Sequence, residues 1–356
     1  MQNTRQMKIG NIVIGGGAPV AVQSMTNTPT ADYDATYRQV CALAQAGCDI
    51  VRVTLNHEGA VESFAKLCAT SPVPIVADIH YNARLALAAV EAGASKVRIN
   101  PGNISRVADL KELAKLCAKC GVGIRIGVNM GSLERAVVEE YGRTATAMVV
   151  SALDQAALLE GFGLHDICIS VKSSDPKETF DAYRMLAESC DYPLHIGVTE
   201  AGGGERAIYK SFACMGGLLH LGIGDTLRVS LSDDPVEEVR AGIELLRAVG
   251  LRRDYVDVMG CPTCGRTTYD VVGISAALRQ ALASNKSPLR VAVMGCVVNG
   301  LGEAGDADIA VVGLTRDKVD IYVLGERRMT LSPDEVVDAV CGLIPTVEKQ
   351  KEARNG

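Results

Sequence analysis

Short β-rich runs alternate with longer helical patterns over the first two-thirds of the chain, and this alternation limits the fold more than any other feature. The runs are separated by segments long enough for a crossover helix, which indicates parallel strands. They occupy residues 20–25, 49–55, 74–79, 96–100, 123–128, 167–172, 195–199 and 226–231. Eight βα units over about 250 residues match a closed (β/α)8 barrel. A doubly wound open sheet is the alternative, but the count and even spacing favour the barrel.

Local signals agree with helices between these runs. Residues 105–120 place apolar side chains at three- and four-residue spacing. Asp175 and Asp234 each precede a proline, which is typical of an N-cap followed by the first helical position. Four glycines are expected to end helices: Gly47, Gly93, Gly121 and Gly250. Ahead of the barrel, residues 8–22 predict a small hairpin with its turn at residues 15–17, and no helix follows that would make these glycines a dinucleotide-binding fingerprint.

The pattern changes after Gly250, so we expect a TIM-barrel domain over residues 1–254 and a smaller α+β domain over residues 255–356. The second domain begins with a cysteine-bearing loop. We expect a helix near residues 275–284, strands near 290–294, 309–312 and 320–324, and a last helix opening with a capping box at residues 332–335.

Composition excludes several classes of function. The net charge is −6, from 36 Lys and Arg against 42 Asp and Glu, and aromatic residues make up 4%. A nucleic-acid or anionic-membrane partner is therefore not expected. No apolar run approaches the roughly 20 residues of a membrane span, and the first residues lack the apolar stretch of a signal peptide. We therefore expect a cytoplasmic protein whose 12 cysteines are reduced, so that clustered cysteines indicate metal or redox chemistry.

Cations interrupt five of the apolar strands, where burial of an unpaired charge costs several kcal/mol. They are Arg52, Arg98, Arg125, Lys172 and Arg228. We expect them toward the carboxyl ends of their strands, where barrel enzymes build their sites. Together with the amides of Asn100 and Asn129, they predict a phosphate or diphosphate site. Internal ion pairing with Asp78 and Glu200 is the alternative.

Three further groups are candidates for the reacting end of this site. Asp78 and His80 share one face of a strand, and Glu200 ends the seventh run, where a carboxylate could transfer a proton.

The cysteine pattern of the second domain indicates a metal centre. Cys261 and Cys264 form a C-x2-C turn, and Cys296 is followed by Glu303. A fourth thiolate is missing, because Cys341 lies in an apolar helical pattern. Three thiolates and an oxygen ligand suggest a [4Fe-4S] cluster with one exchangeable ligand; structural zinc is the alternative. A second C-x2-C pair, Cys117 and Cys120, is interpreted as helix packing.

The motifs GCPTCGRT, from Gly260, and GCVVNGLGEAGDAD, from Gly295, closely resemble those of the 4-hydroxy-3-methylbut-2-en-1-yl diphosphate synthase family of the non-mevalonate isoprenoid pathway. The resemblance runs essentially end to end, with no large insertion between the domains, as in the shorter bacterial form. It includes VQSMTNT from Val22, VADIHYN from Val76, VRINPGN from Val97 and RIGVNMGSL from Arg125.

The resemblance implies an enzyme that reductively opens and dehydrates 2-C-methyl-D-erythritol 2,4-cyclodiphosphate with two electrons from ferredoxin or flavodoxin. It implies one [4Fe-4S] cluster per chain, held by Cys261, Cys264, Cys296 and Glu303. It also implies a homodimer whose active site is shared between subunits. Substrate-binding roles fall to Arg52, Arg98, Asn100, Arg125, Asn129 and Lys172, and catalytic roles to Asp78, His80, Glu200 and Glu303. Our hypothesis is that a substrate oxygen replaces Glu303 at the cluster.

Two other functions remain open at this point. A pterin-type transferase barrel with a structural zinc domain would need no electrons. A redox sensor would use the cluster without catalysis, but it would have no need of the cations in the strands.

Overall fold

The computed structural model describes residues 4–80, 82–100 and 106–355. Tyr81 and residues 101–105, which include parts of two motifs quoted above and the expected helix start at Ser105, lie outside the described residues. The chain divides into two compact units, Met1–Leu251 and Arg252–Gly356. Each unit has its own hydrophobic core. In the described ranges no helix is both long and apolar enough to cross a membrane.

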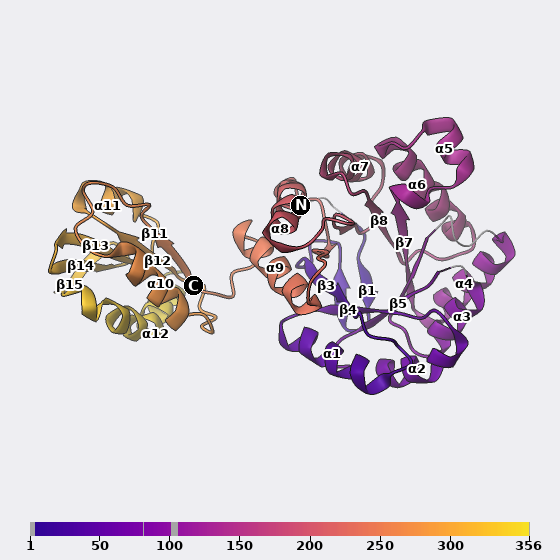
Figure 1. Ribbon diagram of the computed structural model, residues 1–356, viewed down its shortest axis with the longest axis horizontal. Coiled ribbons are helices and arrows are strands. Elements are labelled where there is room, and N and C mark those ends of the chain that lie inside the picture. Colours follow the sequence, from indigo (N-terminus) through magenta and orange to yellow (C-terminus); the bar gives the residue numbers. More distant parts are fainter. Residues whose placement is uncertain (1–3, 81, 101–105, 356) are drawn as a thin grey trace. The chain divides into compact units, whose positions relative to one another are not determined.

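The first unit is a closed barrel of eight parallel strands (Figure 1). Each strand pairs with the next in chain order, the last pairs with the first, and a bridge between Ile169 and Leu194 joins the remaining two. The strands are β3 (Ala21–Met25), β4 (Ile50–Thr54), β5 (Ile75–Asp78), β6 (Lys96–Ile99), β7 (Gly123–Asn129), β8 (Ile167–Lys172), β9 (His195–Ile196) and β10 (Thr226–Leu227). The predicted (β/α)8 barrel is confirmed, and the doubly wound alternative is wrong.

A helix follows every barrel strand and covers its outer face (Figure 1). They are α1 (Tyr33–Gln45), α2 (Val61–Thr70), α3 (Ala83–Glu91), α4 (Val107–Cys120), α6 (Ala145–Gly161), α7 (Pro176–Ser189), α8 (Gly204–His220) and α9 (Pro235–Ala248), with a short additional α5 (Arg135–Tyr141) before α6. The Asp175 and Asp234 side chains accept hydrogen bonds from the first turns of α7 and α9, as expected of N-caps.

A hairpin precedes the barrel, but the prediction for its turn is wrong. Strands β1 (Met7–Ile9) and β2 (Ile12–Ile14) pair antiparallel, and Ile9 lies opposite Ile12. The turn is therefore Gly10 and Asn11, and the expected turn at residues 15–17 follows the hairpin instead. Two glycine-containing turn candidates stand within a few residues, and local propensity does not rank them. The hairpin packs against Ile50, Val76 and Cys168 inside the barrel.

Alternation along each strand decides what faces the barrel interior. Val51 and Val53 are fully buried in the core beneath the helices. Arg52 between them therefore lies on the inner face of β4. The residues that pack against the hairpin form one layer of the barrel interior. Beyond this layer, toward the carboxyl ends of the strands, the same alternation makes the interior polar.

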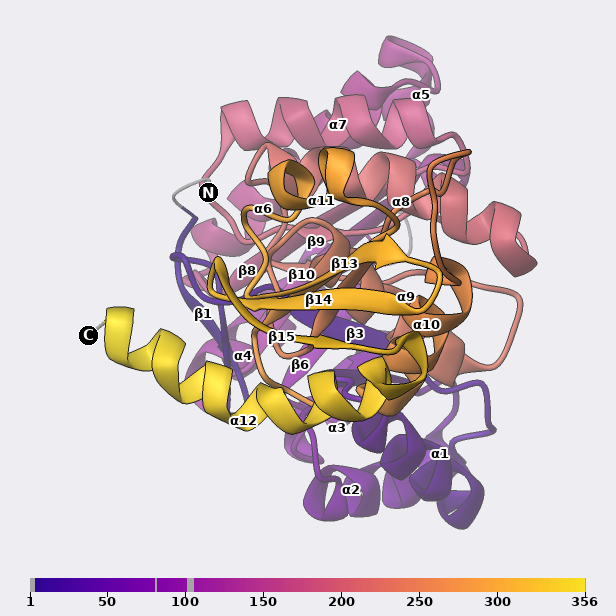
Figure 2. The ribbon, with the colours of Figure 1, turned by 90° about the vertical axis from the view of Figure 1, so that its left-hand side faces the viewer.

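The second unit is a five-stranded sheet in chain order, with its first three strands parallel and the last two antiparallel. The strands are β11 (Asp257–Gly260), β12 (Arg290–Met294), β13 (Ile309–Thr315), β14 (Lys318–Val323) and β15 (Glu326–Leu331). Helices α10 (Val271–Ala281) and α12 (Val336–Asn355) pack on one face and α11 (Val297–Glu303) on the other (Figure 1). Figure 2 shows β13, β14 and β15 side by side and α12 as the long yellow helix.

The capping box at Ser332 and Glu335 is present, but three elements of this unit were not expected. Strand β15 has five exposed residues out of six, so it carries no apolar alternation. Strand β11 is only four residues long and runs into the cysteine loop. Helix α11 contains two glycines within seven residues, which disguises it as a loop.

Candidate active site

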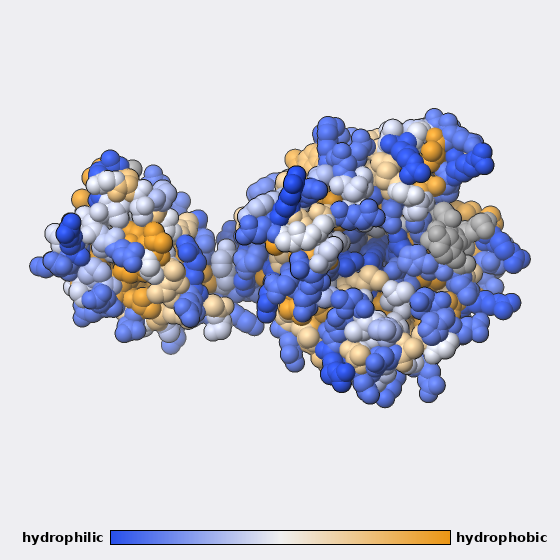
Figure 3. All heavy atoms as spheres, viewed as in Figure 1, coloured by the Kyte–Doolittle hydropathy of each residue, from blue (hydrophilic) through white to orange (hydrophobic). Residues whose placement is uncertain are grey.

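All five predicted cations are brought together inside the barrel. Arg52, Arg98, Arg125 and Lys172 lie on the inner faces of β4, β6, β7 and β8, and Arg228 directly follows β10. A sixth cation, Lys96, was not predicted; it is fully buried on the same face of β6 as Arg98. Figure 3 shows hydrophilic residues gathered in the hollow at the centre of the barrel. Burial lowers the pKa of Lys172 well below its ordinary value, and the nearby charges of Arg125 and Arg52 lower it further. The interior is therefore strongly electropositive.

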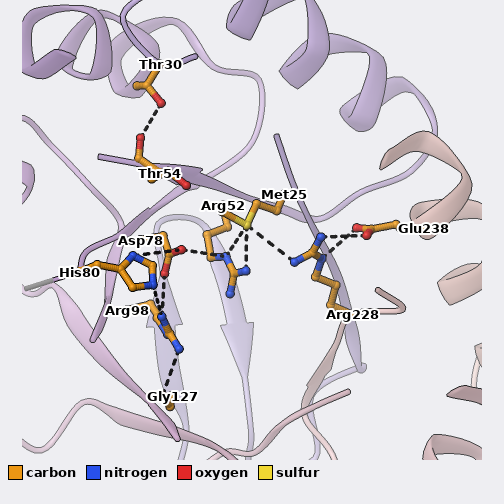
Figure 4. Close-up of polar contacts among 10 residues, drawn as sticks. All are labelled: Met25, Thr30, Arg52, Thr54, Asp78, His80, Arg98, Gly127, Arg228 and Glu238. Carbon is orange, nitrogen blue, oxygen red and sulfur yellow. Dashed lines mark hydrogen bonds and ion pairs between the residues drawn. The ribbon is translucent and has the colours of Figure 1, made fainter. Parts of the chain in front are cut away.

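Asp78 is the buried acid that faces these cations from β5. Its carboxylate lies 3.3 Å from Arg98 Nη1 and 4.0 Å from Arg52 Nε (Figure 4). Burial alone would raise the pKa of Asp78, but these guanidiniums lower it below its ordinary value. Asp78 is therefore ionised at neutral pH. Internal ion pairing thus accounts for part of the cation set.

Arg98 is held in a single orientation by three groups. Its Nη1 is 3.0 Å from His80 Nε2, and its Nη2 donates to the Gly127 carbonyl at 3.1 Å (Figure 4). A Cβ at Gly127 would lie 2.4 Å from Arg98 Nε, so only glycine leaves room there. Burial lowers the pKa of His80, and the Arg98 charge acts in the same direction. A neutral His80 can accept from Arg98 and donate toward Asp78, 3.9 Å away.

Arg125 is one of the buried cations whose donors are not satisfied in the part of the chain that the structure describes; Lys96 is another. Its side chain is 1% exposed, and its Nε and Nη1 have no hydrogen-bond partner within the described ranges. Burial lowers the pKa of Arg125 to about 10. Arg125 is the third of seven residues in β7, so the expectation that every cation lies at the carboxyl end of its strand is wrong for this residue. Its guanidinium provides unused donors deep in the barrel.

A cavity of about 450 Å³ opens at the carboxyl ends of β7 and β8 and beyond β9. It is lined by three of the predicted residues, Asn129, Lys172 and Glu200. Asn100 adjoins it, because its Nδ2 donates to the Ser132 Oγ at 2.8 Å and Ser132 is part of the lining. Glu200 has a φ of +53°, a strained conformation for a residue other than glycine and one found preferentially at functional sites.

Sequence reasoning missed several polar groups of the same cavity. They are Ser132, Arg143, Ser173, Ser174 and Thr199. Ser132, Ser173, Ser174 and Thr199 lie close to the carboxyl ends of predicted strands, and this position is a signal that could have found them, since that edge of a barrel carries the site. Arg143 lies between α5 and α6, where no such signal exists.

The cysteine loops lie at one edge of the second sheet. Cys261 follows β11 and Cys296 follows β12, and the parallel pairing of these strands puts both at the same edge. The Cys261 amide donates to the Val293 carbonyl at 2.9 Å. The loops are tied together by Thr268, whose amide and hydroxyl both donate to the Gly295 carbonyl.

The loop that carries Cys264 has the geometry expected around a thiolate ligand. The Arg266 amide donates to Cys264 Sγ at 3.5 Å, and such N–H···S contacts stabilise cluster-bound thiolates. Thr263 has a φ of +62°, which lets the C-x2-C segment turn sharply. Glu303 is exposed at the end of α11, two helical turns after Cys296. Among the described side chains, no three Cys, His, Asp or Glu groups already surround one metal position.

The other predicted cysteine roles concern packing. Cys117 is buried in the barrel core beneath α4, whereas Cys120 is exposed at the end of that helix. Cys341 is partly buried against the core of the second unit. The interpretation as a packing residue therefore fits Cys117 and Cys341, whereas it is wrong for Cys120, which is exposed.

Two family models match the chain over most of its length. The GcpE TIM-barrel domain matches residues 4–243, and the GcpE protein C-terminal domain matches residues 257–346. The chain belongs to the GcpE family. The family resemblance noted in the sequence is thereby confirmed.

GcpE relatives match nearly end to end. The chain is 49% identical over 349 residues to the 4-hydroxy-3-methylbut-2-en-1-yl diphosphate synthase (flavodoxin) of Caldanaerobacter subterraneus subsp. tengcongensis, covering 98% of each. It is 48% identical to the enzyme of the same name from Symbiobacterium thermophilum, covering 96% of this chain and 93% of that protein. 

A solved structure resembles the GcpE barrel at much lower identity. Dihydropteroate synthase from Burkholderia cenocepacia aligns with a TM-score of 0.51 at 16% identity, covering 69% of this chain and 95% of that one. This likeness shows the barrel fold alone and gives no support to a pterin transferase.

Proposed function

We propose that the cationic interior of the barrel binds 2-C-methyl-D-erythritol 2,4-cyclodiphosphate. The chain is a 4-hydroxy-3-methylbut-2-en-1-yl diphosphate synthase, an oxidoreductase that reductively opens and dehydrates this cyclic diphosphate. The observation that supports the binding site best is Arg125, a buried guanidinium with two unused donor nitrogens. A ligand with several anionic oxygens supplies the acceptors that these donors lack.

The proposed diphosphate site consists of Arg52, Arg98, Arg125, Asn129 and Lys172, with Asn100 beside it and Arg228 as a further cation near Arg52 and Lys172. The five predicted cations and Lys96 meet two buried carboxylates, Asp78 and Glu238, which leaves an excess of positive charge. Asp78 holds Arg98 and Arg52 in place, so that their guanidiniums are oriented before the ligand arrives. Preorganised cations of this kind bind anionic oxygens without first paying the entropy of ordering.

Proton transfer is assigned to groups at the mouth of the barrel. Loss of water from the substrate requires a proton on the departing oxygen. Glu200 lines the cavity and makes no ion pair within the described ranges, so we propose it as the proton donor. His80 and Asp78 orient Arg98 and complete this end of the site.

The family depends on an iron–sulfur centre, and we propose one [4Fe-4S] cluster per chain, held by Cys261, Cys264, Cys296 and Glu303. The donor set fits, because the two cysteine loops are tied together and an amide points at Cys264 Sγ. When bound, such a cluster supplies electrons one at a time and an iron open to an oxygen ligand. 

The proposed electron donor is flavodoxin, which the names of the relatives include, with ferredoxin as the alternative. We further propose a homodimer with an active site shared between subunits, on the basis of the family resemblance. All twelve cysteines are free thiols, which supports the cytoplasm as the proposed compartment.

The first experiment is anaerobic iron and sulfide analysis of the purified protein with an absorbance spectrum, followed by titration with the cyclodiphosphate. We expect about four iron and four sulfide per chain and a spectrum that changes on titration. One zinc per chain without a visible band would contradict the cluster.

Replacing Glu303 tests the exchangeable fourth ligand. The Glu303→Ala chain is expected to keep its cysteine ligands and bound iron but to lose at least about tenfold in kcat, because the proposed fourth ligand of the cluster is gone. Glu352→Ala, an exposed carboxylate on α12, is the control. Full activity in the Glu303→Ala chain would contradict this role.

Replacing Gly197 tests the crowding beneath the proposed diphosphate site. A Cβ there would lie 2.6 Å from Lys172 Nζ and 2.7 Å from the Arg228 carbonyl, so the strand backbone or Lys172 must move. We expect Gly197→Ala to raise KM about tenfold or more and to destabilise the fold by about 1–3 kcal/mol. Gly161→Ala is the control, since nothing lies within 4 Å of its added Cβ. Steady-state kinetics and thermal unfolding measure the two effects, and an unchanged KM would contradict the placement of Lys172.

A further inference from the structure

The Arg228 side chain is held by the buried carboxylate of Glu238, which lies on α9, outside the ring of barrel strands. Its Nε and Nη2 each donate to Glu238, at 2.8 Å to separate oxygens. Glu238 lies in the first turn of α9 and is 2% exposed. The same carboxylate accepts from Ser24 Oγ at 2.8 Å and from the Leu231 amide at 3.0 Å. Four donors from three residues, Arg228, Ser24 and Leu231, thus fix Glu238, and Glu238 fixes Arg228.

Met25 separates Arg228 from the neighbouring guanidinium of Arg52. Its Sδ accepts from Arg52 Nε at 3.1 Å and Nη2 at 2.8 Å, and it lies 3.7 Å from Arg228 Nη1 (Figure 4). A thioether is a weak, polarisable acceptor without charge. Met25 therefore keeps the two positively charged guanidiniums apart, and its sulfur contacts both of them.

We infer that Glu238 is a positioning residue of the diphosphate site, which keeps Arg228 inside the barrel with Met25 as the neutral spacer. This inference rests on the proposed binding of a diphosphate there. Arg228 is surrounded by the charges of Arg52 and Lys172, which repel it. Its side chain is 17% exposed, so it has a route outward. The bidentate carboxylate opposes that movement.

Two simpler roles for Glu238 predict different results. If Glu238 only neutralised Arg228, removing its charge would leave a freer cation and tighten anion binding. If Glu238 only joined α9 to the barrel, its replacement would lower thermal stability without changing affinity. Of the three roles, only the positioning of Arg228 predicts weaker diphosphate binding with nearly unchanged kcat.

The test uses the holoenzyme with the Glu238→Gln substitution. KM for the cyclodiphosphate and Kd for inorganic diphosphate are expected to rise together about tenfold, with kcat changed less than about twofold. Glu237→Gln is the matched control on the same helix, since its exposed carboxylate pairs only with Arg240 at the surface. Met25→Leu keeps the volume and removes the acceptor, and it is expected to raise both constants about threefold.

A double substitution shows whether Glu238 acts through Arg228. Arg228→Gln should raise both constants as Glu238→Gln does, and the pair together should add no further loss. Additive losses, or a KM unchanged or lowered in Glu238→Gln, would overturn the inference. If Glu238→Gln does not fold, Met25→Leu decides, because unchanged constants there would also overturn it. Failure of the unsubstituted holoenzyme to bind the cyclodiphosphate would instead overturn the proposed site itself.

Discussion

A Cys296→Ser chain is expected to lose the reductive activity by at least about a hundredfold and to retain little bound iron. Cys296 lies two residues after the end of β12 and at the same sheet edge as Cys261. A serine hydroxyl is a poor replacement, because thiolates are the ligands that hold iron in such clusters. Iron and sulfide per chain, the visible spectrum and turnover with a reduced electron donor measure the effect.

Cys120→Ser is the matched control for this loss. Cys120 is exposed at the end of α4 and belongs to the other C-x2-C pair. The control chain is expected to keep its iron and its activity. Equal loss of iron in both chains would point to general oxidation damage, and full activity in Cys296→Ser would refute the ligand assignment.

Arg125→Met is expected to raise KM for the cyclodiphosphate at least about a hundredfold while it stabilises the protein. We propose Arg125 as the strongest anion ligand of the set, because two of its donor nitrogens have no hydrogen-bond partner among the described residues. Its pKa is lowered to about 10 by burial, so at neutral pH folding costs on the order of 3 kcal/mol for this charge. Methionine fills a similar volume without that cost, so the free energy of unfolding is expected to increase.

Weaker substrate binding together with a larger free energy of unfolding distinguishes a ligand-binding cation from a structural one. Steady-state kinetics gives KM, and chemical unfolding without ligand gives the free energy of unfolding. Arg240→Met, an exposed arginine on α9, is the control and should change neither by much. An Arg125→Met chain that unfolds more easily and binds substrate normally would mean that Arg125 serves the fold.

The barrel could be predicted because each of its signals is local. Strand β8 was predicted with its observed bounds, and Asp175 and Asp234 begin helices as expected. The hairpin turn was not, because the choice between Gly10 and residues 15–17 depends on how the hairpin packs into the barrel. Strand β15 was missed because its own sequence shows no strand pattern. It is a strand because it pairs with β14.

The candidate site, like the fold, could be predicted only where its signals are local. A cation inside an apolar strand is conspicuous in sequence, so Arg52, Arg98 and Lys172 could be found. Glu238 could not, because it stands beside Glu237 in an ordinary amphipathic helix. Only the packing of α9 against β3 brings its carboxylate to Arg228 and Ser24.

The sequence by itself determined which class of fold forms, which strand residues carry charge and which cysteines can serve as ligands. Periodicity, caps and motif spacing are properties of short segments, and they survive without tertiary context. The tertiary structure decided which of those groups meet. Closure of the barrel sets Asp78 against Arg98 and leaves Nε and Nη1 of Arg125 without a hydrogen-bond partner among the described residues, since burial and distance arise only when strands far apart in the chain lie side by side.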